Sequence, residues 1–163
     1  MLGNMPHTAA SALFLREAEL RRGIELLAFG HAALLRAGDA RLAELGLGRA
    51  HARALYFIAR APDATVTHLL GLLGVTKQSF GRVLNELVAR GLVESRPGPR
   101  DRRERRLRLT EPGRALEAEL FELIRARLAS AYAAAGQGAV GGFWAVLEEL
   151  VPPEQKRLLA SLE

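Results

Sequence analysis

The chain has 163 residues, of which 49% are hydrophobic and 25% are charged. These proportions are typical of a globular protein, and the length suits one domain. No apolar run approaches the ~18 residues of a membrane span, the first ten residues do not read as a secretory signal, and cysteine is absent. The composition therefore excludes disulfides, thiolate metal sites and membrane-spanning helices, and it predicts a soluble protein of the cytoplasm.

The positive charge of the chain is confined to one short segment. The net charge is +5, and residues 96–108 hold seven arginines against two acidic residues. The rest of the sequence carries 16 basic and 16 acidic residues and is neutral. Because the whole excess lies within thirteen residues, we expect this segment to contact a polyanion. The alternative is a solvated charge run without a partner.

The N-terminal segment predicts a long helix from about residue 9 to residue 37. Ile24 and His31 lie on one stripe of this helix with four leucines spaced seven residues apart, which are Leu13, Leu20, Leu27 and Leu34. Such a narrow apolar stripe is typical of packing between helices. Gly38 and Asp39 indicate the end of the helix, and glycines at 46 and 48 bracket a connector.

The next three segments predict a helix-turn-helix. A helix over residues 49–61 ends at Pro62. Thr67 is the expected N-cap of a short helix to residue 73, Gly74 allows a tight turn, and Thr76 caps a third helix that ends near residue 90. Two short helices joined by a glycine turn form this motif. Apolar spacing turns Phe80, Val83, Leu84 and Leu87 toward the core, so the residues expected to contact DNA are Thr76, Lys77, Gln78, Ser79 and Arg82.

The period of the sequence changes between residues 92 and 110. Residues 92–96 and 105–110 predict two short strands, and the intervening segment is rich in turn residues. The resulting hairpin carries the charge excess. Its candidate DNA-contacting residues are Arg96, Arg100, Asp101, Arg102, Arg103 and Arg105.

The C-terminal part predicts further helices. Thr110 and Pro112 open a long helix with leucines along one side, and a last apolar helical region is interrupted at Pro152 and Pro153. Residues 136–141 match the spacing of a dinucleotide-binding glycine loop. Because they follow a helix and no βαβ unit surrounds them, we interpret them as a helix connector.

The sequence resembles the MarR family of bacterial and archaeal transcriptional regulators over about residues 47–120. The segment DRRERRLRLTEPG at 101–113 is similar to the wing motif of that family, and VTKQSFGRVLNELVARGLV at 75–93 is similar to its recognition helix. Leu70 stands where the family often has alanine. The resemblance implies a mainly α, α+β fold with a winged helix-turn-helix and a two-stranded β wing. The expected segments are an N-terminal dimerisation helix at 1–46, a DNA-binding lobe at 47–110 and C-terminal dimerisation helices at 111–163.

The resemblance also implies roles for individual residues. The arginine that matches Arg103 contacts the minor groove in the family, and the aspartate that matches Asp101 orients it. An acid two residues from an arginine can hold the guanidinium by a charge-assisted bond. The first and last helices form the dimer interface, which here involves Leu13, Leu20, Ile24, Leu27, Leu158 and Leu162. The implied function is that of a homodimeric repressor on a palindromic operator, relieved by a small, often aromatic and anionic, ligand.

Other functions have less support in the sequence. None of the four histidines has a partner at metal-ligand spacing, so we expect no metal and no cofactor. His31 is a weak candidate for ligand contact, and a packed histidine is the favoured alternative. No motif of an enzyme appears. A non-sequence-specific RNA or DNA binder would need exposed aromatic residues, and residues 92–110 hold none. A regulator that binds a protein and has lost DNA binding would not need the arginines.

Overall fold

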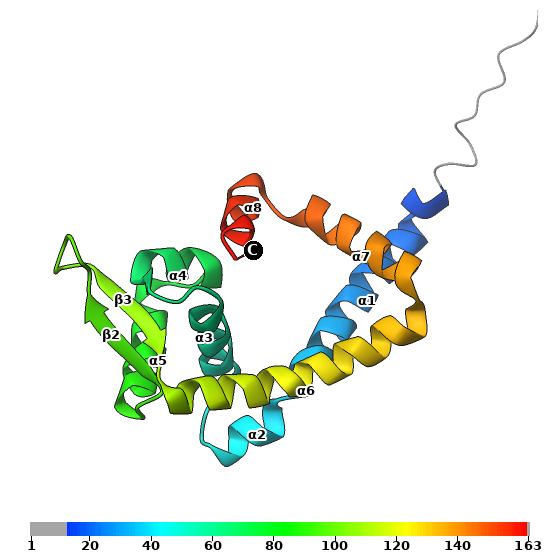
Figure 1. Ribbon diagram of the computed structural model, residues 1–163. Coiled ribbons are helices and arrows are strands. Elements are labelled where there is room, and N and C mark those ends of the chain that lie inside the picture. Colours follow the sequence, from blue (N-terminus) through cyan, green and yellow to red (C-terminus); the bar gives the residue numbers. More distant parts are fainter. Residues whose placement is uncertain (1–12, 163) are drawn as a thin grey trace, which may run out of the picture. The chain divides into compact units, whose positions relative to one another are not determined.

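The computed structural model describes residues 13–162, which form two compact units that divide after Arg36 (Figure 1). The first unit contains a 3-10 turn, η1 (Leu13–Leu15), and helix α1 (Glu17–Arg36). Residues 9–12, where the long helix was expected to begin, lie outside the described part of the chain. The expected three segments 1–46, 47–110 and 111–163 remain a prediction about function.

The second unit begins with α2 (Asp39–Glu44) and α3 (Arg49–Arg60). The expected end of the first helix at Gly38 and Asp39 is confirmed, because α1 ends at Arg36, but the short helix α2 that begins at Asp39 was not predicted. Gly38 adopts a right-handed helical conformation at φ −97° and ψ −7°, so it starts the next helix rather than reversing the chain. The glycine connector that follows is confirmed, since Gly46 has φ +62° and Gly48 is the N-cap of α3.

The helix-turn-helix consists of α4 (Val66–Leu73) and α5 (Lys77–Ala89). The N-cap of α4 is Thr65, whose hydroxyl accepts a hydrogen bond from the His68 amide, so the expectation of Thr67 was wrong by two residues. Gly74 adopts the left-handed conformation at φ +61° that a side chain disfavours, and this confirms the tight turn. The predicted cap of α5 is also confirmed, because the Thr76 hydroxyl accepts from the Ser79 amide.

The wing is an antiparallel hairpin of β2 (Val93–Pro97) and β3 (Arg105–Leu109). In its register Val93 lies opposite Leu109 and Arg96 opposite Arg106. A short strand that the sequence did not predict, β1 (Ala64–Thr65), pairs with the other edge of β3. The sheet therefore has three strands in the order β1-β3-β2, and β1 ties the start of the helix-turn-helix to the wing.

Three helices complete the second unit: α6 (Glu111–Ala135), α7 (Gln137–Leu150) and α8 (Pro153–Ala160). The Thr110 hydroxyl caps α6 and accepts from the amide of Gly113. A Cβ at Gly113 would lie 1.9 Å from the Leu92 carbonyl oxygen, so only glycine lets α6 start this close to the wing. After α7, α8 packs beside α4 (Figure 1). Only Gly136 separates α6 from α7, and residues 137–141 form the start of α7, so the interpretation of 136–141 as a connector was wrong for all but its first residue.

The core lies among α3, α4, α5, the sheet and the first half of α6. Its most deeply buried side chains are Leu55, Ile58, Leu69, Leu87 and Leu107. Burial of such residues contributes roughly 1.5–3 kcal/mol each, so this core gives the helix-turn-helix and the wing a fixed shape. Within the described chain, no helix combines the length and apolar character that crossing a membrane requires.

Candidate nucleic-acid interface

Helix α5 presents a polar surface at its N-terminal end. Buried Phe80 and Leu87 fix the helix on the core. The predicted contact residues Thr76, Lys77, Gln78, Ser79 and Arg82 are all exposed. The Thr76 hydroxyl is occupied as the helix cap, whereas the side chains of Lys77, Gln78 and Arg82 have no hydrogen-bond or ion-pair partner in the described chain. These three side chains are therefore available to bases or phosphates.

The base of the wing uses three of the seven arginines to hold the hairpin in place. Arg96 pairs with Glu94 at 2.9 Å across an exposed face of β2. Arg106 pairs with Glu104 at 3.3 Å and donates to the Asp63 carbonyl oxygen at 3.3 Å. Arg108 forms a two-point ion pair with the carboxylate of Asp63, with Nε 3.0 Å from Oδ1. We call Arg96, Arg106 and Arg108 the root arginines.

Asp63 contacts two of the three root arginines, Arg106 and Arg108. Its φ of +62° places it in the left-handed region, which aspartate tolerates better than most residues. Its amide donates to the Leu107 carbonyl at 2.9 Å, and its carboxylate holds Arg108. The hydrogen bond from Arg108 lowers the pKa of Asp63. Asp63 thus connects the end of α3 to the middle of the wing.

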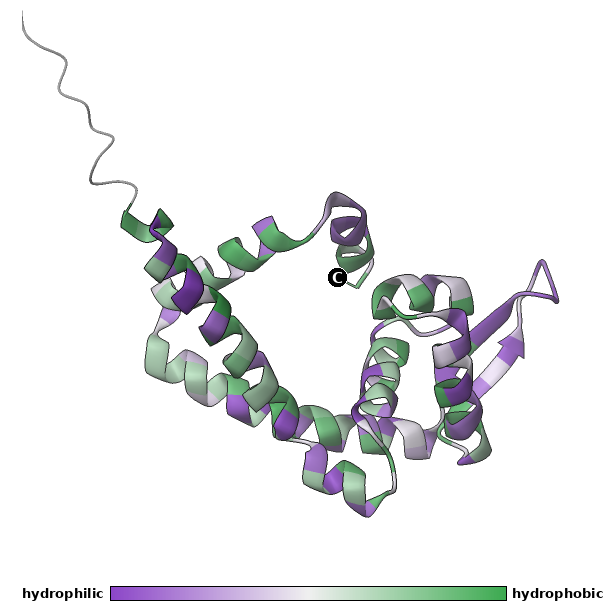
Figure 2. Cartoon of the chain, turned by 180° about the vertical axis from the view of Figure 1, so that it is seen from behind, coloured by the Kyte–Doolittle hydropathy of each residue, from purple (hydrophilic) through white to green (hydrophobic). Residues whose placement is uncertain are grey.

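The tip of the wing carries the other four arginines. Arg100, Arg102, Arg103 and Arg105 are exposed, and within residues 13–162 their guanidinium groups have no hydrogen-bond or ion-pair partner. We call them the tip arginines. Figure 2 shows the hairpin as a hydrophilic extension of the lobe. A set of exposed, unpaired guanidinium groups is suited to phosphates or to the negative potential of a minor groove.

Asp101 shapes the tip differently from what the sequence suggested. Its Oδ1 accepts a hydrogen bond from the backbone amide of Arg103 at 2.9 Å. No bond joins this carboxylate to the Arg103 guanidinium in the described chain. The aspartate therefore orders the turn that presents Arg103, as aspartates do in tight turns, and leaves the guanidinium free.

The residues expected at the dimer interface fall into two groups. Leu13, Leu20, Ile24 and Leu27 have exposed fractions of 44–69%. Leu158 and Leu162 are half-buried within their own unit. A Cβ at Gly71 would lie 3.2 Å from the Leu158 side chain, and the Leu162 carbonyl accepts a hydrogen bond from Arg60. Leu158 thus has a packing role inside the chain, which the sequence did not indicate.

Two further expectations concern ligands. His31 is exposed on α1, and it has no hydrogen-bond partner in the part of the chain that the structure describes. Within one chain the ring is therefore not packed, and its packing in a dimer stays a prediction. No group of three or more potential metal ligands occurs among residues 13–162.

Sequence reasoning missed four residues that position the interface: Asp63, His51, Glu86 and Arg90. Asp63 follows a proline and reads as an ordinary turn residue. His51 and Glu86 are 35 positions apart, and their bond at 2.8 Å depends on how α5 lies against α3. No local pattern reveals such a pair, since neither residue breaks the periodicity of its helix.

Comparisons with known proteins agree with this geometry. The model of the MarR family matches residues 45–104. The HTH-type transcriptional regulator PetP of Rhodobacter capsulatus is 51% identical over 145 residues, which cover 89% of this chain and 87% of that protein. FabT of Streptococcus pneumoniae, solved in complex with DNA, has a TM-score of 0.71 at 21% identity, covering 88% of this chain and 99% of that one. A mutant MarR of E. coli complexed with operator DNA has a TM-score of 0.66 at 24% identity, with coverage of 86% and 99%.

Proposed function

Because this chain belongs to the MarR family of DNA-binding transcriptional regulators, we propose that it is a homodimeric repressor that recognises an imperfect palindrome. Family membership makes it a regulator rather than an enzyme. Its DNA, and hence the protein, is expected in the cytoplasm. The observation that carries the proposal is the presence of two unpaired polar surfaces on one lobe, the start of α5 and the tip arginines.

The two surfaces suit different parts of a duplex. The major groove is about 12 Å wide and admits a helix, so Gln78 can reach the edge of an adenine and Lys77 or Arg82 a guanine or a phosphate. Strand β2 packs against α5, which keeps the wing beside that helix. The tip arginines are then suited to the adjacent minor groove and its phosphates. In this proposal α5 provides sequence preference and the wing provides most of the electrostatic attraction.

Dimerisation is supported by the apolar face of α1. Leu20 and Ile24 are 50% and 69% exposed, and Leu27 on the same side of the helix is 44% exposed. Burial of about four such side chains would contribute roughly 1.5–3 kcal/mol each before the entropic cost of association. A two-fold dimer would present its two α5 helices to successive major grooves about 34 Å apart. A second copy of this chain is therefore the proposed partner of α1.

A charge on α1 tests the dimer. Leu20→Glu places an unpaired carboxylate in the proposed interface, so sedimentation should show monomers and specific DNA binding should be lost through loss of two-site avidity. Ala18→Glu adds the same charge on the opposite side of α1 and should leave a dimer. A wild-type monomer at micromolar concentration with full affinity for a palindrome would contradict the proposal.

The proposed effector site is a hollow of about 230 Å³ between α3, α4 and α8. Its wall is largely apolar, with Phe57, Leu72 and Leu158, and Arg53 lies at the hollow without a partner in the described chain. An apolar wall beside one cation suits a small aromatic carboxylate. Benzoate should raise the Tm and weaken operator binding, and Arg53→Ala should abolish both effects. If benzoate changes neither quantity in the wild-type protein, the proposed site is wrong.

Selection of bound fragments from a genomic pool of the source organism tests the function. The wild-type protein should enrich a small set of duplexes that share an inverted repeat with half-sites about 10 base pairs apart. Even recovery of all fragments, or preference for single-stranded DNA or RNA, would instead favour a binder without sequence preference. A reporter placed behind the enriched site then distinguishes repression from activation.

A further inference from the structure

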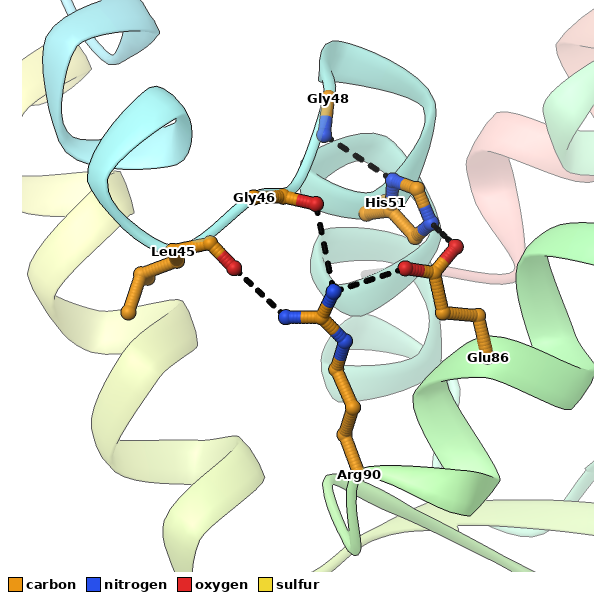
Figure 3. Close-up of polar contacts among 6 residues, drawn as sticks. All are labelled: Leu45, Gly46, Gly48, His51, Glu86 and Arg90. Carbon is orange, nitrogen blue, oxygen red and sulfur yellow. Dashed lines mark hydrogen bonds and ion pairs between the residues drawn. The ribbon is translucent and has the colours of Figure 1, made fainter.

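A polar network joins α5 to α3 and to the loop that precedes α3 (Figure 3). Glu86 lies in the last half of α5, and its carboxylate contacts both His51 of α3 and Arg90 at the C-cap of α5. Arg90 also donates to the Leu45 carbonyl at 2.6 Å and to the Gly46 carbonyl at 3.3 Å. We call His51, Glu86, Arg90 and these loop carbonyls the Glu86 latch.

The contacts of His51 fix its tautomer. The Gly48 amide donates to His51 Nδ1 at 3.0 Å, so Nδ1 must carry a lone pair. The proton of the neutral ring is then on Nε2, which donates to Glu86 Oε2 at 2.8 Å. The ring therefore has one acceptor and one donor role, and exchanging them would lose both bonds. His51 therefore requires a hydrogen-bond acceptor at the position of Glu86 Oε2.

The Glu86 carboxylate is satisfied on both oxygens. His51 donates to Oε2, and Arg90 Nη2 donates to Oε1 at 2.8 Å. The hydrogen bond from His51 lowers the pKa of Glu86, so the carboxylate is ionised at neutral pH. The side chain of His51 is only 15% exposed, whereas that of Glu86 is 41% exposed. The latch therefore lies at the edge of the core, where α5 emerges toward solvent.

The latch adjoins the surface proposed to read DNA. His51 and Glu86 line a hollow together with Ser79, Arg82 and Val83. Glu86 is four residues after Arg82 and seven after Ser79, which puts all three on one side of α5. A rotation of α5 about its axis would therefore move the latch and the DNA-contacting side chains together.

We propose that Glu86 is a positioning residue for DNA recognition, which fixes the rotation of α5 through His51 and Arg90 so that Gln78 and Arg82 face the groove. This inference deepens the proposed function of α5 and rests on it. The apolar contacts of α5 attract without direction and hold the helix against the core. Hydrogen bonds to His51 and Arg90 depend on angle and distance, so they can select one rotation.

The proposal and simple electrostatics predict opposite results. A carboxylate on a helix that faces DNA repels phosphates, so charge alone predicts that Glu86→Gln binds all DNA more tightly. In the latch, however, glutamine has one acceptor oxygen and a donor NH2 group in place of two acceptor oxygens, so it cannot accept from both His51 and Arg90 in their present positions. Glu86→Gln should therefore break one of the two hydrogen bonds and lower the preference for the operator.

The test compares Glu86→Gln with Glu122→Gln. Glu122 pairs with Arg125 on an exposed face of α6, so the control removes the same charge and an ion pair away from α5. Affinities for the selected operator and for random duplex DNA are measured with each protein. We expect Glu86→Gln to lower the ratio of the two affinities by about tenfold, and Glu122→Gln to leave it unchanged. Arg90→Lys, which keeps the charge but removes the planar fork, should lower the ratio by an intermediate factor.

A second measurement reports on the latch without DNA. The ¹⁵N chemical shifts of the His51 ring should show the Nε2-protonated tautomer in the wild-type protein and a mixture of tautomers in Glu86→Gln. An unchanged ratio with tighter binding to both DNAs, an equal loss on both DNAs, or a wild-type ring that is not in this tautomer would each overturn the proposal. If the wild-type protein selects no operator, the proposed function fails, and the ring shifts still decide whether the latch exists.

Discussion

The root and the tip of the wing use the same residue type for different purposes. At the root, Arg106 and Arg108 are half-buried and engage Asp63 and Glu104. At the tip, Arg100, Arg102, Arg103 and Arg105 are exposed and have no ion pair in the described chain. The two groups adjoin in the sequence, since Arg105 belongs to the tip and Arg106 to the root. The difference shows that a run of arginines is not one electrostatic feature, because geometry decides which charges remain for a ligand.

This division has a physical consequence for binding. A root arginine that is already paired would have to leave its carboxylate before it could contact a phosphate. A tip arginine needs no such exchange, and the Asp101 turn presents it in an ordered loop. We therefore expect the tip to determine DNA affinity and the root to determine the stability of the lobe.

The largest expected effect is that of Arg103→Ala. Loss of this guanidinium should weaken operator binding by more than about tenfold, while the free energy of unfolding stays nearly unchanged because the side chain has no partner in the described chain. Titrations at low salt measure the affinity, and urea denaturation measures the stability. Arg127→Ala removes an exposed arginine of α6 that has no partner among residues 13–162, and it is the matched control. If Arg103→Ala and the wild-type protein bind the operator with equal affinity, Arg103 does not contribute to the DNA interface.

Gln78→Ala separates the preference of the protein for its operator from its general affinity for DNA. If Gln78 contacts a base, the variant should lose about 1–3 kcal/mol of discrimination at one operator position and keep its affinity for random DNA. Binding to a set of operators with single base changes measures this loss. A uniform loss on operator and random DNA would mean that Gln78 contacts the backbone of the duplex.

At the root, Asp63→Asn should act on stability. Asparagine tolerates the left-handed conformation of this position, but it lacks the charge that holds Arg108. Because the pair is partly exposed, we expect the free energy of unfolding to fall by only about 0.5–1 kcal/mol. Asp101→Asn at the tip is the control and should leave stability unchanged. A more stable Asp63→Asn would show that the ion pair does not hold the wing.

The smallest expected effect is on stability in acid. The hydrogen bond from Arg108 lowers the pKa of Asp63 in the folded protein below the value of about 3.9 in the unfolded chain. The ionised carboxylate therefore contributes its stability above about pH 4, and this contribution is lost as the pH falls through the lowered pKa. Asp63→Asn should show a shallower decline of Tm in this range than the wild-type protein. Parallel declines would contradict the assignment.

The sequence predicted the elements whose signals are local. Thr76 was predicted as a cap and Thr110 as the start of a helix, and in the structure the hydroxyl of each threonine caps its helix. Thr65 was missed because Thr67 is an equally good cap by type, and only the pairing of β1 with β3 fixes where α4 begins. Strand β1 has only two residues, too few to show the alternation of apolar and polar residues that is typical of a strand. Helix α2 was missed because Gly38 resembles a stop.

For the interface, the sequence predicted the exposed residues better than their supports. The polar start of α5 and the tip arginines follow from periodicity and from the location of charge. The roles of Asp63 and of the Glu86 latch depend on contacts between residues 35 to 45 positions apart, and these contacts exist only after the lobe has folded. Asp101 was predicted in part. It contacts Arg103 as expected, but its partner is the backbone amide of Arg103 and not the guanidinium.

Salt dependence of operator binding tests the division of the wing most directly. Each phosphate contact releases counterions, so log affinity falls with log salt by about 0.9 for each phosphate neutralised. A variant with Arg100, Arg102, Arg103 and Arg105 all changed to Gln should have a slope that is shallower by about 0.9 for each phosphate that the tip no longer neutralises, with an unfolding free energy close to that of the wild-type protein. An unchanged slope in this variant would contradict the account, because it would mean that the tip arginines do not contact the DNA backbone.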